Sequence, residues 1–276
     1  MAKVGTAPIS WGACEIPRWG DQLPWERVLD EMVASGYSGT ELGPWGYLPN
    51  DATTLGRALG TRGLTLAGAF CPVTLHRDRD AGIRQAEETA RLLAALGAPV
   101  LVLADAGRET TFTERLWRQF NEGVNEVARR ARALGLLTAF HPHVGSQIES
   151  SDEIGRLLAG TDSDLVGLCL DTGHVAYAGG DIVGLARAHG PRIRHVHLKD
   201  LRPDRRGGEL RDAVGRGVFA PLGEGSLPLR ELARALAPYE GWLIVEQDVR
   251  LGVTPGADPA RDARTSRAFV RDAFGA

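Results

Sequence analysis

Lysine and cysteine are scarce in this sequence, and long apolar runs are missing. Only Lys3 and Lys199 occur among 276 residues. The three cysteines, Cys14, Cys71 and Cys169, lie far apart without a CxxC pair, which argues against a disulfide framework and a thiolate zinc site. No apolar run approaches the roughly 20 residues that span a bilayer, and no signal peptide is visible. We therefore expect a cytoplasmic protein without a membrane partner.

The charge balance excludes another class of partner. A formal net charge of −3 gives no electrostatic basis for binding nucleic acid. The chain can form a substantial hydrophobic core, because 43% of its residues are hydrophobic. Its length matches the roughly 250 residues that are typical of an eight-fold α/β barrel.

Strand-like and helical stretches alternate along the chain. The residue patterns predict strands at 3–12, 37–42, 64–70, 100–105, 136–140, 165–170, 192–200 and 242–248. They predict helices at 24–33, 51–59, 79–96, 113–134, 151–159, 181–189, 227–236 and 259–274. Such alternation implies parallel pairing, and eight units close a barrel. The sequence thus predicts a single α/β domain over residues 1–276, a (β/α)8 TIM barrel.

Two features qualify this fold prediction. A doubly wound open sheet is the alternative, but no GxGxxG motif follows the first strand and no break divides the chain. The Gly- and Arg-rich segment at about 203–225 interrupts the alternation. It is predicted to be a long loop that acts as a lid or an interface element.

The seventh predicted strand carries an unusual row of polar residues. His195, His197 and Lys199 alternate with apolar residues, so the three side chains share one face of the strand. Two imidazoles and an amine that face an interior need a metal, an ionised substrate or a dense hydrogen-bond network. A solvated edge strand is the alternative interpretation.

Comparable side chains follow the other strands. Active sites of such barrels form at the C-terminal ends of the strands. The candidates there, in chain order, are Trp11, Glu41, Phe70, Asp105, His141, His143, Asp171, His174, His197, Lys199, Asp200, Glu246, Gln247 and Asp248. Imidazoles and carboxylates concentrate on strands five to eight, which are neighbours in a barrel. This clustering favours a metal site over a buried polar network without metal.

The predicted metal ligands combine two imidazoles with two carboxylates. They are His141, Asp171, His197 and Glu246. Such ligands suit divalent Mn, Co, Zn, Fe or Ni, and four of them leave room for two substrate oxygens. Alternation does not separate His143 from His141, so the choice between these two remains open. His197 is favoured over His195 because His195 lies deeper in its strand.

These motifs resemble those of the xylose-isomerase-like barrels, the sugar phosphate isomerase/epimerase superfamily, and within it the inosose dehydratases of inositol catabolism. The resemblance rests on residues 7–12 (APISWG), 39–43 (GTELG), 141–145 (HPHVG), 170–174 (LDTGH), 195–200 (HVHLKD) and 241–246 (GWLIVE). It implies a divalent metal, with Mn or Co expected and Zn, Fe, Ni and Mg left open. It also implies that Asp171, His197, Glu246 and a strand-five residue bind this metal.

One departure from the superfamily pattern bears on the reaction. Many of its epimerases and isomerases have a glutamate where this chain has His141. An epimerase uses paired carboxylates on the two faces of a carbon, and an imidazole at this position weakens that scheme. Together with this departure, the resemblance to inosose dehydratases implies a lyase that dehydrates a keto-polyol such as 2-keto-myo-inositol by α-proton abstraction and β-hydroxyl loss. A sugar or inosose isomerase or epimerase is the alternative.

The remaining candidates are assigned to proton transfer and substrate binding. Lys199 is the preferred proton-transfer residue because a neighbouring dication and burial would lower its pKa; the alternative is a salt bridge to Asp200 or another carboxylate. Glu41 is the second proton carrier, with a hydrogen bond to a substrate hydroxyl as its alternative role. Glu246 is counted among the catalytic residues as well as the metal ligands. The predicted substrate contacts are His143, His174, Arg202 and Trp11. The expected partner is a small polyol or sugar, and a homo-oligomer is left open.

Overall fold

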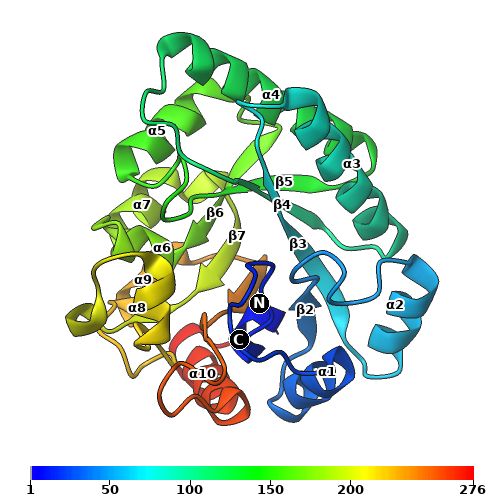
Figure 1. Ribbon diagram of the computed structural model, residues 1–276, viewed down its shortest axis with the longest axis vertical. Coiled ribbons are helices and arrows are strands. Elements are labelled where there is room, and N and C mark those ends of the chain that lie inside the picture. The colour runs from blue at the N-terminus through cyan, green and yellow to red at the C-terminus, as the bar shows by residue number, and fades with distance from the viewer. Residues whose placement is uncertain (1) are drawn as a thin grey trace. The chain divides into compact units, whose positions relative to one another are not determined.

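The computed structural model describes residues 2–276, and eight strands among these residues form a closed barrel in the order β1-β10-β7-β6-β5-β4-β3-β2 (Figure 1). The strands are β1 (Lys3–Thr6), β2 (Gly39–Glu41), β3 (Thr65–Val73), β4 (Val100–Asp105), β5 (Leu137–His141), β6 (Val166–Asp171), β7 (Ile193–Leu198) and β10 (Trp242–Val245). The pairings are parallel, as in the register of β1 with β10. The predicted (β/α)8 fold class is confirmed.

The helices follow the predicted alternation. They are α1 (Trp25–Ala34), α2 (Ala52–Gly60), α3 (Arg79–Ala95), α4 (Glu114–Ala133), α5 (Ser151–Gly160), α6 (Thr172–Tyr177), α7 (Ile182–His189), α8 (Leu210–Gly215), α9 (Leu229–Leu236) and α10 (Pro259–Phe274). Thr113 and Asp258 cap α4 and α10 with their side chains, as expected. The first predicted strand is shorter than expected, because Pro8–Trp11 forms a 3-10 turn with proline at its start. None of the described helices has the length and apolar character needed to cross a membrane.

The described residues group into two compact units. The first unit combines the chain up to Ala67 with Val196–Ala276, and the second is Gly68–His195. In the first unit, β1 pairs with both β10 and β2, and β10 pairs with the end of β7. Its interior cluster is Ala7, Ala67, Trp242 and Ile244. A side chain at Gly39 would come within 2.5 Å of the Trp242 ring, so this close approach requires glycine.

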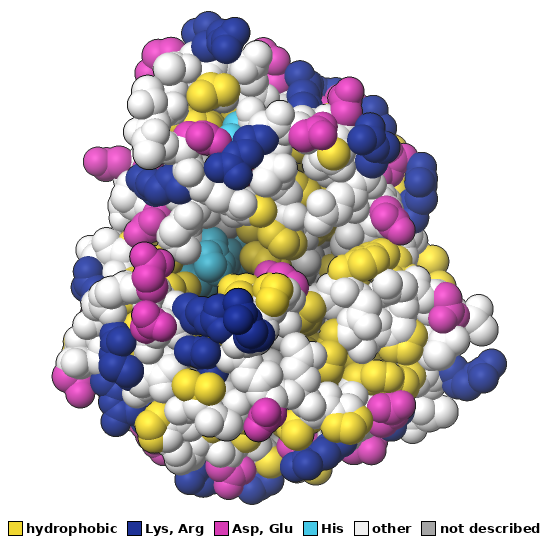
Figure 2. Space-filling model, in the orientation of Figure 1, with side chains coloured by type: hydrophobic (Ala, Val, Ile, Leu, Met, Phe, Trp, Pro, Cys, Tyr) yellow, Lys and Arg dark blue, Asp and Glu magenta, His cyan; other side chains and the backbone are white. Residues whose placement is uncertain are grey.

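The second unit contains four strands in sequential parallel pairing. β3 pairs with β4, β4 with β5, and β5 with β6. Val100, Val102, Ala139 and Cys169 form an apolar cluster on one face, with Phe70 packed against it. The helices α3 and α4 pack side by side on the outside of β4 (Figure 1). Figure 2 shows basic and acidic side chains mixed across the visible face of the molecule.

The predicted long loop at 203–225 contains regular structure. It begins with a 3-10 turn at Pro203–Arg205 and includes α8 and β9 (Phe219–Ala220). β9 pairs antiparallel with β8 (Asp200–Leu201). These short elements were not predicted, because elements of two to six residues are too short to give a periodic pattern. The role of the segment as a lid or an interface element stays a prediction.

Asp200 organises this segment with its carboxylate. The two oxygens accept hydrogen bonds from the backbone N–H groups of Leu201, Gly223, Gly225 and Leu227 at 2.9–3.1 Å. A carboxylate is an acceptor on both oxygens, so all four donors are satisfied. Asp200 therefore acts as a structural anchor for the segment that follows β8.

We expect Asp200→Asn to lower the free energy of unfolding by about 3 kcal/mol, because an amide replaces one acceptor oxygen with a donor and leaves buried N–H groups without a partner. Urea unfolding measures this change as a lower midpoint at unchanged slope. Asp204→Asn, at an exposed position three residues beyond the Asp200–Leu201 strand, is the matched control. Equal midpoints for the two variants would contradict the anchoring role.

Candidate functional site

The predicted ligand and proton-transfer residues lie at or just after the ends of the barrel strands. Glu41, His141 and Asp171 are the last residues of β2, β5 and β6. His197 is the penultimate residue of β7, whereas Lys199 and Glu246 directly follow β7 and β10. All six side chains are buried. Their predicted position at the C-terminal ends of the strands is confirmed.

In the second unit, Asp171 links two histidines. Its Oδ2 lies 3.2 Å from His141 Nε2, and its Oδ1 accepts the backbone N–H of His174 at 2.7 Å as the N-cap of α6. The cap fixes the carboxylate in place. Ligand atoms of His141, Asp171 and His174 all lie within 4.8 Å of one another, which is close enough for them to share a cation. The helix α6 itself was not predicted, but the Asp-Thr-Gly-His motif marks its start.

Hydrogen bonds indicate which ring nitrogen carries the proton in His143 and in His174. His143 Nδ1 lies 2.8 Å from the carbonyl oxygen of Val144, so Nδ1 donates. His174 Nδ1 accepts the N–H of Val144 at 3.4 Å, so its proton resides on Nε2. The His143 and His174 rings lie 4.0 Å apart between centroids. Both predicted substrate contacts are therefore oriented by the same turn after β5.

His141 and His143 differ in their surroundings, which bears on the open choice of a strand-five ligand. His141 is buried beside Asp171, and Phe70 meets its ring edge-on at 5.3 Å. His143 is partly exposed and stacks on His174. The carboxylate contact thus favours His141.

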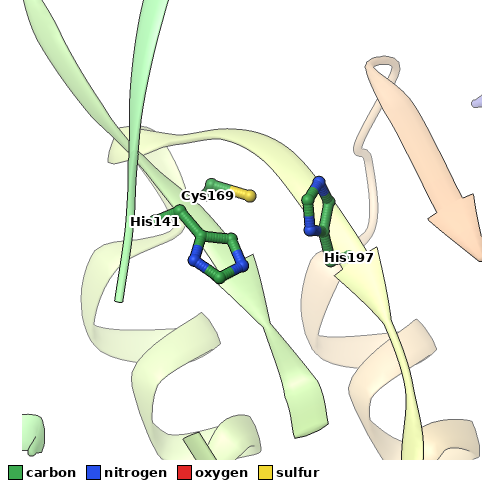
Figure 3. A group of neighbouring side chains, drawn as sticks. All are labelled: His141, Cys169 and His197. Carbon is green, nitrogen blue, oxygen red and sulfur yellow. The ribbon is translucent and has the colours of Figure 1, made fainter. Parts of the chain in front are cut away.

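Cys169 is a neighbour of His141 that the sequence analysis did not single out for this site. It lies on β6 two residues before Asp171, so alternation puts both side chains on one face. Figure 3 draws Cys169 from β6 and His141 from β5, together with His197 from β7. Cys169 Sγ and a ring nitrogen of His141 lie within 4.8 Å of each other. The thiol is fully buried in the apolar cluster.

In the first unit, His197 lies between two carboxylates. Its Nε2 is 3.1 Å from Glu41 Oε1, and its Nδ1 is 3.2 Å from Glu246 Oε2. The same Glu246 oxygen accepts a hydrogen bond from Lys199 Nζ at 2.5 Å. Asp248 Oδ1 lies 3.4 Å from that ammonium group. The side chains of Glu41, His197, Glu246, Lys199 and Asp248 therefore form a continuous buried polar chain.

The chemical groups of this chain suit a bound cation. Burial raises the pKa of the Glu246 carboxyl, but His197 and Lys199 outweigh burial and lower this pKa to about 2. Glu41 and Asp248 add two further carboxyl groups to the cluster. Buried charged groups are paired with one another or coordinate a metal. The donor set of imidazole and carboxylate also suits a divalent transition metal.

The salt-bridge alternative for Lys199 is present in the structure, with neighbouring carboxylates rather than with Asp200. Its ammonium contacts Glu246 and Asp248. The oxygens of Asp200, the partner considered in the sequence analysis, accept backbone N–H groups instead. Two neighbouring carboxylates favour the charged ammonium form of Lys199.

Trp11 and Arg202 have structural partners. Trp11 is fully buried, and its indole N–H donates to Glu31 Oε2 at 2.8 Å. Arg202 Nη1 donates to the carbonyl oxygens of Gly217 and Phe219 at 3.4 and 3.3 Å. These contacts position the chain after β1 and around β9. The substrate contacts of both residues stay predictions.

Asp105 differs from the other strand-end residues because it faces the helix layer. It has the parity of Leu101 and Leu103, whereas Val100 and Val102 belong to the interior cluster. Its Oδ1 lies 3.1 Å from His76 Nδ1, and its Oδ2 accepts the N–H of Gln147 at 3.1 Å. Burial raises the pKa of the Asp105 carboxyl. Alternation could have separated Asp105 from the candidate site.

The chain is similar in sequence, over most of its length, to proteins of known family. The chain is 32% identical to an inosose dehydratase of Geobacillus thermodenitrificans, over 99% of this chain and 97% of the relative. It is 36% identical to the rhizopine catabolism protein MocC of Rhizobium meliloti, over 89% of this chain and 81% of that protein. It is also 31% identical to an inosose dehydratase of Lacticaseibacillus casei, over 89% of each.

Solved structures share the fold at lower identity. The crystal structure of IOLI protein with a binding zinc atom superposes with a TM-score of 0.77 at 17% identity, over 99% of this chain and 98% of the other. An L-ribulose 3-epimerase has the same TM-score at 18% identity, over 100% and 95%. The sequence model described as xylose isomerase-like TIM barrel matches residues 19–273. The chain therefore belongs to the xylose isomerase-like TIM barrel family.

Proposed function

We propose that this chain is a metal-dependent hydro-lyase of the inosose dehydratase type, which removes water from a keto-polyol such as 2-keto-myo-inositol. The observation that carries the proposal is the pair of imidazole–carboxylate contacts at strand ends, His141 with Asp171 and His197 with Glu246, each at 3.2 Å. The full-length similarity to inosose dehydratases supports the choice of substrate. No disulfide joins the cysteines of the described residues, in keeping with the cytoplasmic location that the proposal includes.

We propose that these four residues together hold one divalent ion, with Mn²⁺ or Co²⁺ favoured. The proposal rests on the position of each residue at the C-terminal end of its strand, where barrel enzymes build their sites. The buried contacts of His197 with Glu41 and Glu246 support it, because imidazole and carboxylate are common ligands of such ions. Zinc, named for the structurally similar IOLI protein, is a further candidate. When bound, such an ion supplies Lewis-acid polarisation of the ketone oxygen.

The proton transfers are assigned to Lys199 and Glu41. Lys199 is held as an ammonium by Glu246 and Asp248, which suits proton donation to the departing β-hydroxyl. Glu41 accepts the proton α to the ketone. The C–H electron pair then forms the new carbon–carbon double bond, and the hydroxyl leaves as water. His143 and His174, oriented by the turn at Val144, are proposed to hydrogen-bond substrate hydroxyl groups.

Product analysis tests this function. The purified protein, stripped with a chelator and reloaded with Mn²⁺ or Co²⁺, is expected to convert 2-keto-myo-inositol to a product lighter by one water, with the absorbance of a conjugated dione. The alternative is an isomerase or epimerase, which the structural similarity to L-ribulose 3-epimerase favours. A product of unchanged mass would replace the dehydratase assignment with this alternative.

A further inference from the structure

Lys199 is the most deeply buried ammonium group of the first unit, and it has two carboxylate neighbours. Its side chain is 2% exposed, and that of Asp248 is 10% exposed. Nζ lies 2.5 Å from Glu246 Oε2 and 3.4 Å from Asp248 Oδ1. The Phe219 ring, with its centroid 6.0 Å from Nζ, borders the same space. Lys199 thus has a short contact to one carboxylate and a longer contact to another.

The two carboxylates are not equivalent for a metal site. Glu246 Oε2 contacts His197 Nδ1 as well as Lys199, so the oxygen that pairs with Lys199 belongs to the imidazole–carboxylate pair. Asp248 contacts the same ammonium group at 3.4 Å, the longer of these two contacts. A dication on Glu246 would face the Lys199 ammonium at close range, and like charges repel strongly where water is excluded. Lys199 and a metal therefore compete for Glu246.

A buried ammonium that leaves Glu246 needs another anion. Asp248 supplies one within reach, because a small side-chain movement of Lys199 shortens the 3.4 Å contact to a hydrogen bond. The order of residues after β10 explains the arrangement. Glu246 and Asp248 alternate with Gln247, whose amide points away and donates to Asp262 at 3.3 Å. Both acidic side chains contact the Lys199 ammonium group.

We infer that Asp248 is a positioning residue that receives Lys199 when Glu246 binds the divalent ion. This inference rests on the metal site of the proposed function and adds a residue to it. In the exchange, Lys199 moves from Glu246 to Asp248 without losing its charge partner. Asp248 thereby draws the competing ammonium group away from Glu246 and keeps it within the buried cluster.

Mn²⁺ binding to four forms of the protein tests the exchange without reference to turnover. Titration calorimetry is used for the wild type, Asp248→Asn, Lys199→Met and the double variant. We expect Asp248→Asn to weaken Mn²⁺ binding about tenfold, because Lys199 then loses the Asp248 carboxylate and keeps its contact with Glu246; couplings of this size are found between contacting residues. Lys199→Met is expected to bind Mn²⁺ at least as tightly as the wild type. The double variant should match Lys199→Met, because Asp248 has no role once Lys199 is absent.

Several outcomes would overturn the inference. Unchanged affinity in Asp248→Asn would do so while leaving the metal site intact. Equal weakening by Asp248→Asn in the presence and absence of Lys199 would make Asp248 an independent partner of the ion. If the wild type binds no Mn²⁺, Co²⁺ or Zn²⁺, the proposed metal site itself fails. Two variants serve as controls. Asp248→Glu keeps the charge and is expected to retain Mn²⁺ affinity within a few fold, and Asp204→Asn changes an exposed carboxylate. Circular dichroism establishes that each variant is folded.

Discussion

Glu246→Gln is expected to weaken Mn²⁺ binding by more than about 100-fold, because loss of a ligand exceeds the 10–100-fold typical of losing an outer partner. Glu246 follows β10, and its oxygen contacts both His197 and Lys199. The glutamine keeps the size of the side chain but removes the anion. Lys199 keeps Asp248 as a charge partner, so the protein is expected to remain folded. Equilibrium dialysis against Mn²⁺ measures the loss.

Stoichiometry extends this prediction to the other ligands. If the two imidazole–carboxylate pairs hold one ion, His141→Ala and His197→Ala should each abolish the same single equivalent of bound Mn²⁺. His189→Ala, at the last residue of α7, is the matched control and should bind one equivalent. Retention of one equivalent in His141→Ala would instead assign the ligand role to His143. Two equivalents in the wild type, each lost with a different pair, would divide the proposed site into two.

Alternation along the strands explains why so much of the candidate site was predictable. Each predicted ligand follows an apolar run at a strand end, and a strand has only two faces. His141 and Asp171, on adjacent strands, are consequently found 3.2 Å apart. The same rule, applied to Asp105, would have directed it to the helix layer. There it meets His76, which lies beyond the end of β3 and gives no periodic signal of its own.

Contacts that depend on irregular backbone could not be predicted from the sequence. The elements at 203–220 are too short to show a period, and Asp200 holds them through backbone N–H groups that no residue pattern reveals. The partner of Trp11 lies on α1, and its identity depends on how the turn after β1 folds back. The choice of Glu246 and Asp248 over Asp200 as partners of Lys199 depends on the direction of side chains that follow β10, outside the regular strand.

Lys199→Met is expected to lower kcat about 1,000-fold, within the 10²–10⁴-fold range of a positioned proton donor. Methionine fills a similar buried volume but carries no proton, so the departing hydroxyl must leave without its acid. Mn²⁺ binding should survive, because the substitution removes a competitor for Glu246 and leaves His141, Asp171, His197 and Glu246 unchanged. Steady-state kinetics with 2-keto-myo-inositol, measured beside Mn²⁺ affinity on the same preparations, separates these two effects.

The sequence offers an internal control for this substitution. Lys3 on β1 is the other lysine of the chain, and its ammonium lies 5.6 Å from the Trp242 ring, apart from the polar chain around His197. Lys3→Met removes the same charge and is expected to leave kcat within about twofold, because a cation–π contact at an exposed site contributes little. Near-normal turnover in Lys199→Met would reduce Lys199 to a charge partner of Glu246 and Asp248. A 1,000-fold loss of kcat in Lys199→Met with intact Mn²⁺ binding would assign proton transfer to Lys199. A residue that only balanced charge would change the Mn²⁺ affinity before it changed the chemical step.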